Sequence, residues 1–242
     1  MLGCGIDLGT SGCRLALVDA AGPIQQLSCP YPGAFRQAES WRLGVQQLFA
    51  QLQEEHRQQI GAIAIDGTSG TLLACRPTGE PLAAALAYND ACPEQAEQAR
   101  QLVPAGGSAA SSSGSVARGL LLLDRLKLQP GSDLLLRHQA DWLMGWLLGD
   151  WRWGEEGNNL RLGWDLLQNQ WTGGIARSSW AGALPQVIPS GQLVGPIGAK
   201  AAAELKLPAS CQIVSGTTDA NAAVLAAEPQ EGDGVAVLGT TL

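Results

Sequence analysis

Four short segments rich in Gly, Ser, Thr and Asp constrain the fold of this chain most strongly, because each follows an apolar run of strand length. The first covers residues 7–12, inside the stretch "GIDLGTSGCRLALVD", and the second covers residues 66–70. The other two are residues 215–219 and 239–241. Short apolar runs that end in such clusters are typical of buried strands. The pattern therefore predicts polar turns at the carboxyl ends of strands, where ligands bind in open α/β sheets.

The order of strand and helix patterns predicts an α/β fold, in which helices cover both faces of a mixed sheet. A β-meander is expected over residues 3–28, and helical spacing of apolar residues after Ser40 predicts a helix to about residue 56. The low complexity of residues 104–115 predicts a mobile loop. Further strands are expected at 60–67, 71–76 and 83–88, and two more begin at 211 and 233. Further helices are expected at 93–102, after Ser115, through much of 132–180 and from 218 or 219.

The composition of the 242-residue chain limits its size class and its partners. With 45% hydrophobic and 15% charged residues, it resembles a folded protein with one large domain or two small ones. The net charge is −7, and there is no basic run. This charge argues against nucleic acid or an anionic membrane as the main partner, but not against a nucleotide, which needs only local donors.

The cysteines and the apolar segments indicate a cytoplasmic protein. The six cysteines include no C-x-x-C pair, which favours reduced core thiols over a zinc site or a disulfide framework. The start of the chain has no basic segment followed by a long apolar one, so no signal peptide is expected. The longest apolar candidate, residues 140–151, is interrupted by Asp141 and Asp150 and is too short to span a bilayer.

The residue types in the four polar segments suit a phosphate and metal site. Glycines let backbone N–H groups approach a phosphate, Ser and Thr add hydroxyl donors, and a neighbouring Asp can hold Mg²⁺ directly or through water. Each segment alone also has an ordinary structural interpretation as a hairpin turn, a strand-ending turn or a helix N-cap. Four of them at predicted strand ends favour a site for the phosphates and metal of a nucleotide.

The same segments carry a resemblance to a known family. Residues 5–19, the stretch "AIAIDGTSGTLLACRPTGEPLAAALAYND", the stretch "VSGTTDANAAVLAA" and "GVAVLGTT" near the end closely resemble the amino-terminal half of the FGGY carbohydrate kinases. That resemblance covers nearly the whole chain. It implies a ribonuclease H-like lobe of the actin and hexokinase superfamily, one of two lobes around a cleft. Within the family, the chain looks most like the pentulose kinases.

The resemblance implies roles for residues of the first segment. Asp7 would lie beside Mg²⁺ and the transferred phosphoryl group, and Gly9, Thr10 and Ser11 would form the first phosphate loop. Arg14 stands where glycerol kinase also has Arg, and would neutralise charge on the γ-phosphate. The alternative for Arg14 is a solvated strand residue.

The resemblance also implies an ATP loop and a base in the later segments. Gly239, Thr240 and Thr241 match the last phosphate loop of the family. Asp219 matches the catalytic base, and it would also contact the sugar. The following residue, Ala220, departs from the Asn of xylulose kinases.

Three residues match the part of the family that contacts the sugar. Thr68 and Ser69 stand where xylulose kinases have Met-His and glycerol kinase has Arg-Glu, so the substrate is open at this point. Asn158 falls in a loop that often lines the sugar pocket, although a turn pair with Asn159 is the alternative. Small hydroxyls leave room for a polyol, and Ser69 in place of the bulkier His makes D-ribulose our first choice.

The expected function is ATP-dependent phosphorylation of a primary hydroxyl of a sugar, a pentulose such as D-ribulose or D-xylulose. Leu242 follows the fourth polar segment by one residue, so we expect residues 1–242 to be the amino-terminal, sugar-binding lobe of a longer kinase. Its partners would be the sugar, ATP and the carboxy-terminal ATP-binding lobe of the same protein. The alternative is a non-catalytic sugar-binding or interaction domain derived from such a kinase.

Overall fold

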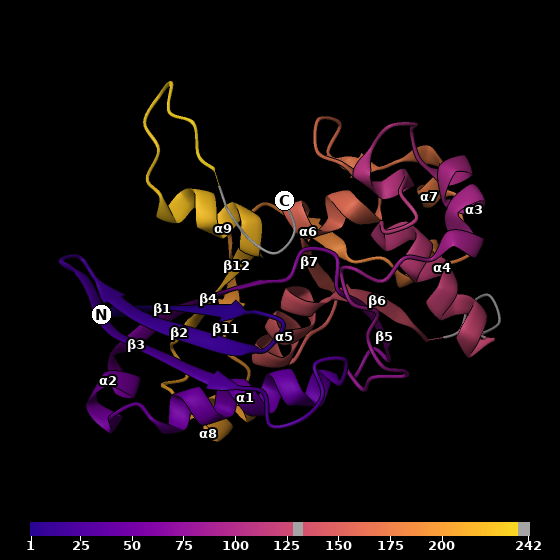
Figure 1. The fold of residues 1–242 in the computed structure, drawn as a ribbon. Coiled ribbons are helices and arrows are strands. Elements are labelled where there is room, and N and C mark those ends of the chain that lie inside the picture. Colours follow the sequence, from indigo (N-terminus) through magenta and orange to yellow (C-terminus); the bar gives the residue numbers. More distant parts are fainter. Residues whose placement is uncertain (128–132, 237–242) are drawn as a thin grey trace.

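A computed structural model describes residues 1–127 and 133–236, and its centre is a six-stranded mixed sheet (Figure 1). The strand order is β11-β12-β4-β1-β2-β3. The two central pairs, β1 with β4 and β4 with β12, are parallel, and the outer pairs are antiparallel. This confirms the α/β fold with a mixed central sheet. The bounds are β1 Leu2–Leu8, β2 Gly12–Asp19, β3 Gly22–Pro30, β4 Ile60–Gly67, β11 Leu193–Pro196 and β12 Gln212–Thr218.

One face of the sheet is packed against helices α1 (Ala38–Ala50), α5 (Gln139–Leu148) and α8 (Ala199–Leu205), which also contact one another. Alternation along β1 explains this packing, because Leu2, Cys4, Ile6 and Leu8 are buried while Asp7 lies on the opposite face. In Figure 1, helices α6 (Glu156–Asn159) and α9 (Asp219–Ala226) lie on the other side of the sheet from α1 and α8.

A second apolar core lies beside the sheet, at the right of Figure 1. The strand pair β5 (Leu72–Cys75) and β6 (Leu135–His138) contacts α4 (Ser115–Leu126), which also contacts α3 (Ala96–Leu102). The remaining elements are α2 (Glu54–Gln59), α7 (Gly173–Ala176), β7 (Trp153–Glu155), β8 (Trp164–Asp165), β9 (Gln170–Trp171), β10 (Gln186–Ile188) and 3₁₀ turns at Pro93–Gln95, Ser108–Ala110, Leu160–Leu162 and Ala181–Ala183.

Two predictions for the first half of the chain are wrong. The helix expected to residue 56 is split into α1 and α2, because the chain turns after residue 50 and buries Leu52. The strand expected at 83–88 is absent: Leu86 bonds Leu72, but its neighbour Ala85 donates to the Arg36 carbonyl, so no ladder forms.

Three predictions for later segments also need correction. Residues 104–115, expected to form a mobile loop, include the 3₁₀ turn Ser108–Ala110, whose Ala109 and Ala110 are buried in the second core. The segment 132–180 is less helical than expected: its one long helix is α5, and the short strands β6, β7, β8 and β9 lie between short helices and turns, with Trp164 and Trp171 of the β8–β9 hairpin packed edge to face at 5.3 Å. Residues 233–236 form no strand, and residues 237–242 lie outside the described part of the chain.

All six cysteines are free, as expected for reduced thiols. Among residues 1–127 and 133–236, no helix has both the length and the apolar character that crossing a bilayer requires.

The closeness of β12 to β4 at Gly216 can be tested by substitution. A Cβ on Gly216 would lie 1.7 Å from the Ile65 carbonyl oxygen, whereas a Cβ on Gly5 of β1 meets nothing within 4 Å. We expect Gly216→Ala to lower the free energy of unfolding by about 1–3 kcal/mol or more through overpacking. Gly5→Ala, the matched control, should change it by less than about 1 kcal/mol. Urea denaturation measures both, and equal effects would contradict this packing.

Candidate functional site

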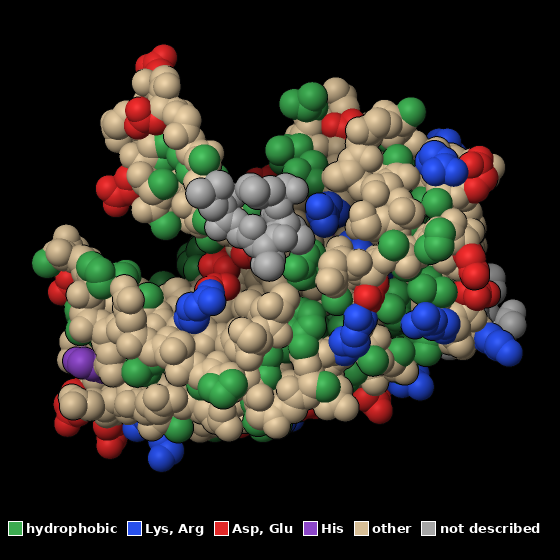
Figure 2. All heavy atoms as spheres, in the orientation of Figure 1, with side chains coloured by type: hydrophobic (Ala, Val, Ile, Leu, Met, Phe, Trp, Pro, Cys, Tyr) green, Lys and Arg blue, Asp and Glu red, His purple; other side chains and the backbone are tan. Residues whose placement is uncertain are grey.

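Three carboxylates meet at the carboxyl ends of the three parallel strands. Asp7 and Asp66 are register partners on β1 and β4, and Asp66 is also the register partner of Thr217, two residues before Asp219. All three carboxylates line one cleft of about 520 Å³. Figure 2 shows the surface hollowed beside β1 and β2, where acidic side chains lie next to a basic one. Parallel strand ends thus bring together residues that are distant in sequence.

The turn between β1 and β2 forms one wall of this cleft. The Gly9 N–H donates to the Gly12 carbonyl at 3.0 Å, which closes the turn. Tyr31, at the end of β3, donates its N–H to the Ser11 carbonyl at 3.4 Å and its hydroxyl to the Gly9 carbonyl at 2.9 Å. Thr10 and Ser11 line the cleft and are exposed. The turn is therefore held from behind while its polar residues face the cleft.

Arg14 on β2 forms an ion pair with Asp7 inside the cleft. The Arg14 side chain is 66% exposed, so the pair contributes little to stability. For the same reason, Arg14 is placed to exchange Asp7 for another anion at small cost.

Asp66 lies between the two other carboxylates and is strongly perturbed. Burial, and then the negative charges of Asp7 and Asp219, raise the pKa of Asp66 from 3.8 to about 8. Arg14 opposes this rise only in part. At neutral pH the Asp66 carboxyl is therefore mostly protonated, and the fold holds a site that favours added positive charge.

The turn after β4 contains both predicted sugar residues, and they lie differently. Thr68 lines the cleft, yet its side chain is nearly buried and its hydroxyl bonds to Thr71 and Gln139, each at 2.6 Å. Ser69 is half-buried, and its N–H donates to Asp219 Oδ1 at 3.3 Å. The structure thus places Ser69 beside Asp219, and it ties Thr68 into the floor of the cleft.

Asp219 begins α9, immediately after the N-cap Thr218, whose hydroxyl accepts from the Asn221 N–H at 3.3 Å. Asp219 Oδ1 accepts from the Ala220 N–H at 2.8 Å and from Ser69. Within the described residues Oδ2 accepts no hydrogen bond, and the residue is exposed. One carboxylate oxygen is thus oriented by the backbone, and the other is available to a ligand.

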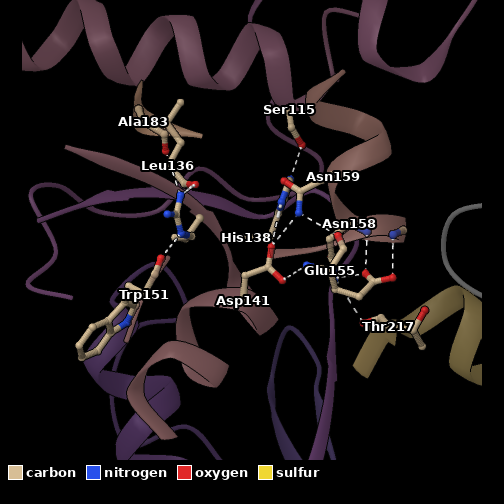
Figure 3. A network of polar contacts seen from close by, with 12 residues as sticks. Ser115, Leu136, His138, Asp141, Trp151, Glu155, Asn158, Asn159, Ala183 and Thr217 are labelled. Carbon is tan, nitrogen blue, oxygen red and sulfur yellow. Dashed lines mark hydrogen bonds and ion pairs between the residues drawn. The ribbon is translucent and has the colours of Figure 1, made fainter. Parts of the chain in front are cut away.

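Asn158 lies inside the wall of the site and not on its surface (Figure 3). Its side-chain amide donates to Glu155 Oε2 at 2.9 Å and to the Thr217 carbonyl at 3.4 Å. Glu155 also accepts from the backbone of Gly157 and Asn158 and from the Ser190 hydroxyl, and burial raises its pKa. These contacts join α6 to the end of β12, and the role of Asn158 in sugar binding stays a prediction.

A second polar cluster in Figure 3 has the composition of a hydrolase triad but not its accessibility. His138 Nε2 bonds to Ser115 Oγ at 2.9 Å, and Nδ1 lies 3.6 Å from Asp141 Oδ2. Ser115 and His138 have no exposed surface, and burial lowers the pKa of His138. A substrate cannot reach the Ser115 hydroxyl, so the cluster joins α4 to β6 and α5 as a structural contact.

The cleft residues are suited to a magnesium ion held partly by phosphates and water. They are less suited to a metal site made of protein ligands alone. The described residues include no group of three or more His, Cys, Asp or Glu side chains placed to hold a metal. Mg²⁺ usually takes one or two carboxylates, several waters and substrate phosphates. Asp7 and Asp66 supply that many carboxylates, side by side at the ends of β1 and β4. Gly239, Thr240 and Thr241 lie outside the described residues.

The sequence places Asp66 in the second polar segment, where it ends an apolar run just before a glycine, as Asp7 nearly does. It assigns Asp66 no role of its own, and it gives no indication of Gln139. Gln139, which bonds Thr68, carried no signal, because a single glutamine before an apolar helix belongs to no motif.

Known proteins resemble this chain in structure more clearly than in sequence. No family model matches the sequence. Xylulose kinase from Rhodospirillum rubrum aligns with a TM-score of 0.79 at 19% identity, covering 94% of this chain and 52% of that one. Glycerol kinase from Plasmodium falciparum aligns with a TM-score of 0.78 at 15% identity, covering 93% and 49%. Gluconate kinase from Lactobacillus acidophilus aligns with a TM-score of 0.71 at 16% identity, covering 90% and 48%.

The chain has the fold of carbohydrate kinases. It spans about half the length of the solved structures it matches. The structural comparison agrees with the predicted resemblance, and the expected kinase-like α/β fold is confirmed.

The perturbation of Asp66 predicts a pH-dependent stability. The unfolded chain releases the Asp66 proton above pH 3.8, whereas the folded chain keeps it to about pH 8. The contribution of Asp66 to the free energy of unfolding therefore falls as the pH rises through this window. We expect Asp66→Asn to remove that fall, so that the Tm of the variant gains on the wild type from pH 3.8 to about pH 8.

Thermal unfolding across this pH range is the measurement. Glu55→Gln, at an exposed carboxylate on α2, is the control and should follow the wild-type curve. Parallel curves for Asp66→Asn and the wild type would contradict the assignment.

Proposed function

We propose that this chain is the sugar-binding, amino-terminal lobe of an ATP-dependent carbohydrate kinase that phosphorylates a primary hydroxyl of a sugar. A pentulose is the expected acceptor, D-ribulose first and D-xylulose second. The observation that carries the proposal is the convergence of Asp7, Asp66 and Asp219 at adjacent strand ends, in a chain with the fold of carbohydrate kinases.

The cleft supports a division of labour between its two sides. The turn at residues 9–12, with Arg14 beside it, suits the phosphates of ATP, because exposed hydroxyls and a guanidinium line that side. Asp219 lines the other side, where the Ser69 N–H bonds to it, and this side suits a polyol hydroxyl. Asp7 and Asp66 lie between them and would hold Mg²⁺, which supplies charge neutralisation at the phosphates when bound.

Asp219 is the proposed general base. Its Oδ2 would accept the proton of the sugar hydroxyl while that oxygen forms a bond to the γ-phosphorus and the bond from phosphorus to the ADP oxygen breaks. Oδ1 stays oriented by the N–H groups of Ser69 and Ala220. Phosphoryl transfer needs mainly alignment and electrostatic stabilisation, which a preoriented carboxylate and a rigid turn provide.

The alternative is a non-catalytic sugar-binding or interaction domain. The chain spans about half of each carbohydrate kinase it matches, so its described residues supply only part of such an enzyme's fold. Sugar binding without ADP release would support this alternative.

Asp219→Asn tests the base directly. The substitution keeps the shape and the acceptor oxygen but removes the proton-accepting charge, so we expect kcat to fall by ~10²–10⁴. ADP release by the natural gene product, with Mg-ATP and D-ribulose, D-xylulose or glycerol, is the measurement.

Asp124→Asn, at an exposed carboxylate on α4, is the control and should retain normal turnover. Near-normal turnover in Asp219→Asn would show that another group accepts the proton. No ADP release from the wild type with any of the three acceptors would contradict the kinase proposal.

A further inference from the structure

A continuous series of hydrogen bonds runs beneath the proposed sugar turn and reaches Gln139. The Tyr88 N–H donates to Thr71 Oγ1 at 3.2 Å, and the Thr71 and Thr68 hydroxyls lie 2.6 Å apart. Thr68 Oγ1 donates to Gln139 Oε1 at 2.6 Å, and the Thr68 N–H donates to the same oxygen at 3.1 Å. The Gln139 N–H itself donates to the Thr71 carbonyl at 3.1 Å, so Gln139 holds the turn at three points.

The series of hydrogen bonds continues from Gln139 to the proposed phosphate turn. Gln139 Nε2 donates to the Tyr31 hydroxyl oxygen at 3.5 Å, and that hydroxyl donates to the Gly9 carbonyl at 2.9 Å. Burial raises the pKa of Tyr31, which keeps the phenol protonated as a donor. Gln139 has no exposed surface and lies at the start of α5, on the rigid core side of the sheet.

Chemistry at the two ends sets the direction of every bond. Thr68 donates its single hydroxyl proton to Gln139 Oε1, so the Thr71 hydroxyl must donate to Thr68. The Gly9 carbonyl can only accept, so Tyr31 donates to it and accepts from Gln139. Gln139 must accept on one side and donate on the other. An amide does both, whereas a carboxylate cannot donate and an apolar side chain can do neither. Bonds aligned in one direction also polarise and strengthen one another.

We infer that Gln139 is a positioning residue that fixes the proposed sugar turn at 68–71 relative to the proposed phosphate turn at 9–12. The inference rests on the proposed function for the roles of the two turns. The hydrogen-bonded link through Gln139 between the two turns, called the tie below, does not depend on those roles. Gln139 touches neither substrate, because it lies wholly inside the protein. It acts through Thr68, which lines the cleft, and through Tyr31, which anchors Gly9.

Three variants separate the two halves of the tie. Tyr31→Phe removes only the hydroxyl that links Gln139 to Gly9. Gln139→Glu keeps the shape and the acceptor for Thr68 but loses the donor, so it also breaks the link to the phosphate turn. Gln139→Met removes both and leaves the Thr68 N–H without an acceptor. Gln51→Glu, an exposed position just after α1, is the chemical control.

Amide hydrogen exchange of the purified chain tests the tie without any substrate. We expect Tyr31→Phe and Gln139→Glu to speed exchange up to about tenfold in residues 8–13 and to leave residues 66–72 within about threefold. Gln139→Met should speed exchange in both segments. The double variant Tyr31→Phe/Gln139→Glu should exchange no faster in residues 8–13 than either single variant, because both break one link.

Kinetics on the natural gene product then test the positioning role. Gln139→Glu should lower kcat about tenfold with the sugar KM within about threefold, whereas Gln139→Met should raise the sugar KM about tenfold as well. Unchanged exchange in both segments with Gln139→Met would overturn the inference. So would faster exchange spread evenly over the whole chain, or kcat and KM that match those of Gln51→Glu. If the variants change exchange as predicted but the wild-type protein has no kinase activity, the proposed function alone would be refuted.

Discussion

Side-by-side pairing of β1, β4 and β12 in parallel register is the constraint on which the rest of the site depends. The register sets Asp7 opposite Asp66 and brings the end of β12, with Asp219, beside them. Burial of Asp66 and the nearby carboxylates of Asp7 and Asp219 make its charged form costly, which is why its pKa is raised. The apolar face of the same strands, packed on α1, α5 and α8, supplies the stability that offsets this cost.

Buried polar side chains hold the walls of the cleft in place at the ends of these strands. Glu155 and Asn158 hold α6 against the end of β12, and Gln139 holds the turn after β4. None of these side chains is exposed enough to contact a ligand freely. Gln139 accepts from the N–H of Thr68, next to Ser69, and Asn158 donates to the carbonyl of Thr217, two residues before Asp219. These two contacts help to fix where Ser69 and Asp219 lie.

The strand ends of the site are predictable from the sequence because each combines an apolar run with a polar turn. That pattern alone places Asp7, Ser69 and Asp219 at one edge of a sheet. The supporting residues are not predictable in this way. Gln139 and Glu155 belong to no recognisable motif, and only the fold reveals which backbone groups they reach. The absent strand at 83–88 has a similar cause, since Ala85 pairs with the distant Arg36 carbonyl.

The most direct test of the central claim is an NMR titration of the ¹⁵N-labelled chain with D-ribulose. If the strand ends form the sugar site, the backbone amides of Ser69 and Ala220 should shift most, because both donate to Asp219 Oδ1. The same shifts should be lost in Asp219→Asn. Saturating sugar that leaves these two amides unmoved, or that moves only amides away from the cleft, would contradict a sugar site at these strand ends.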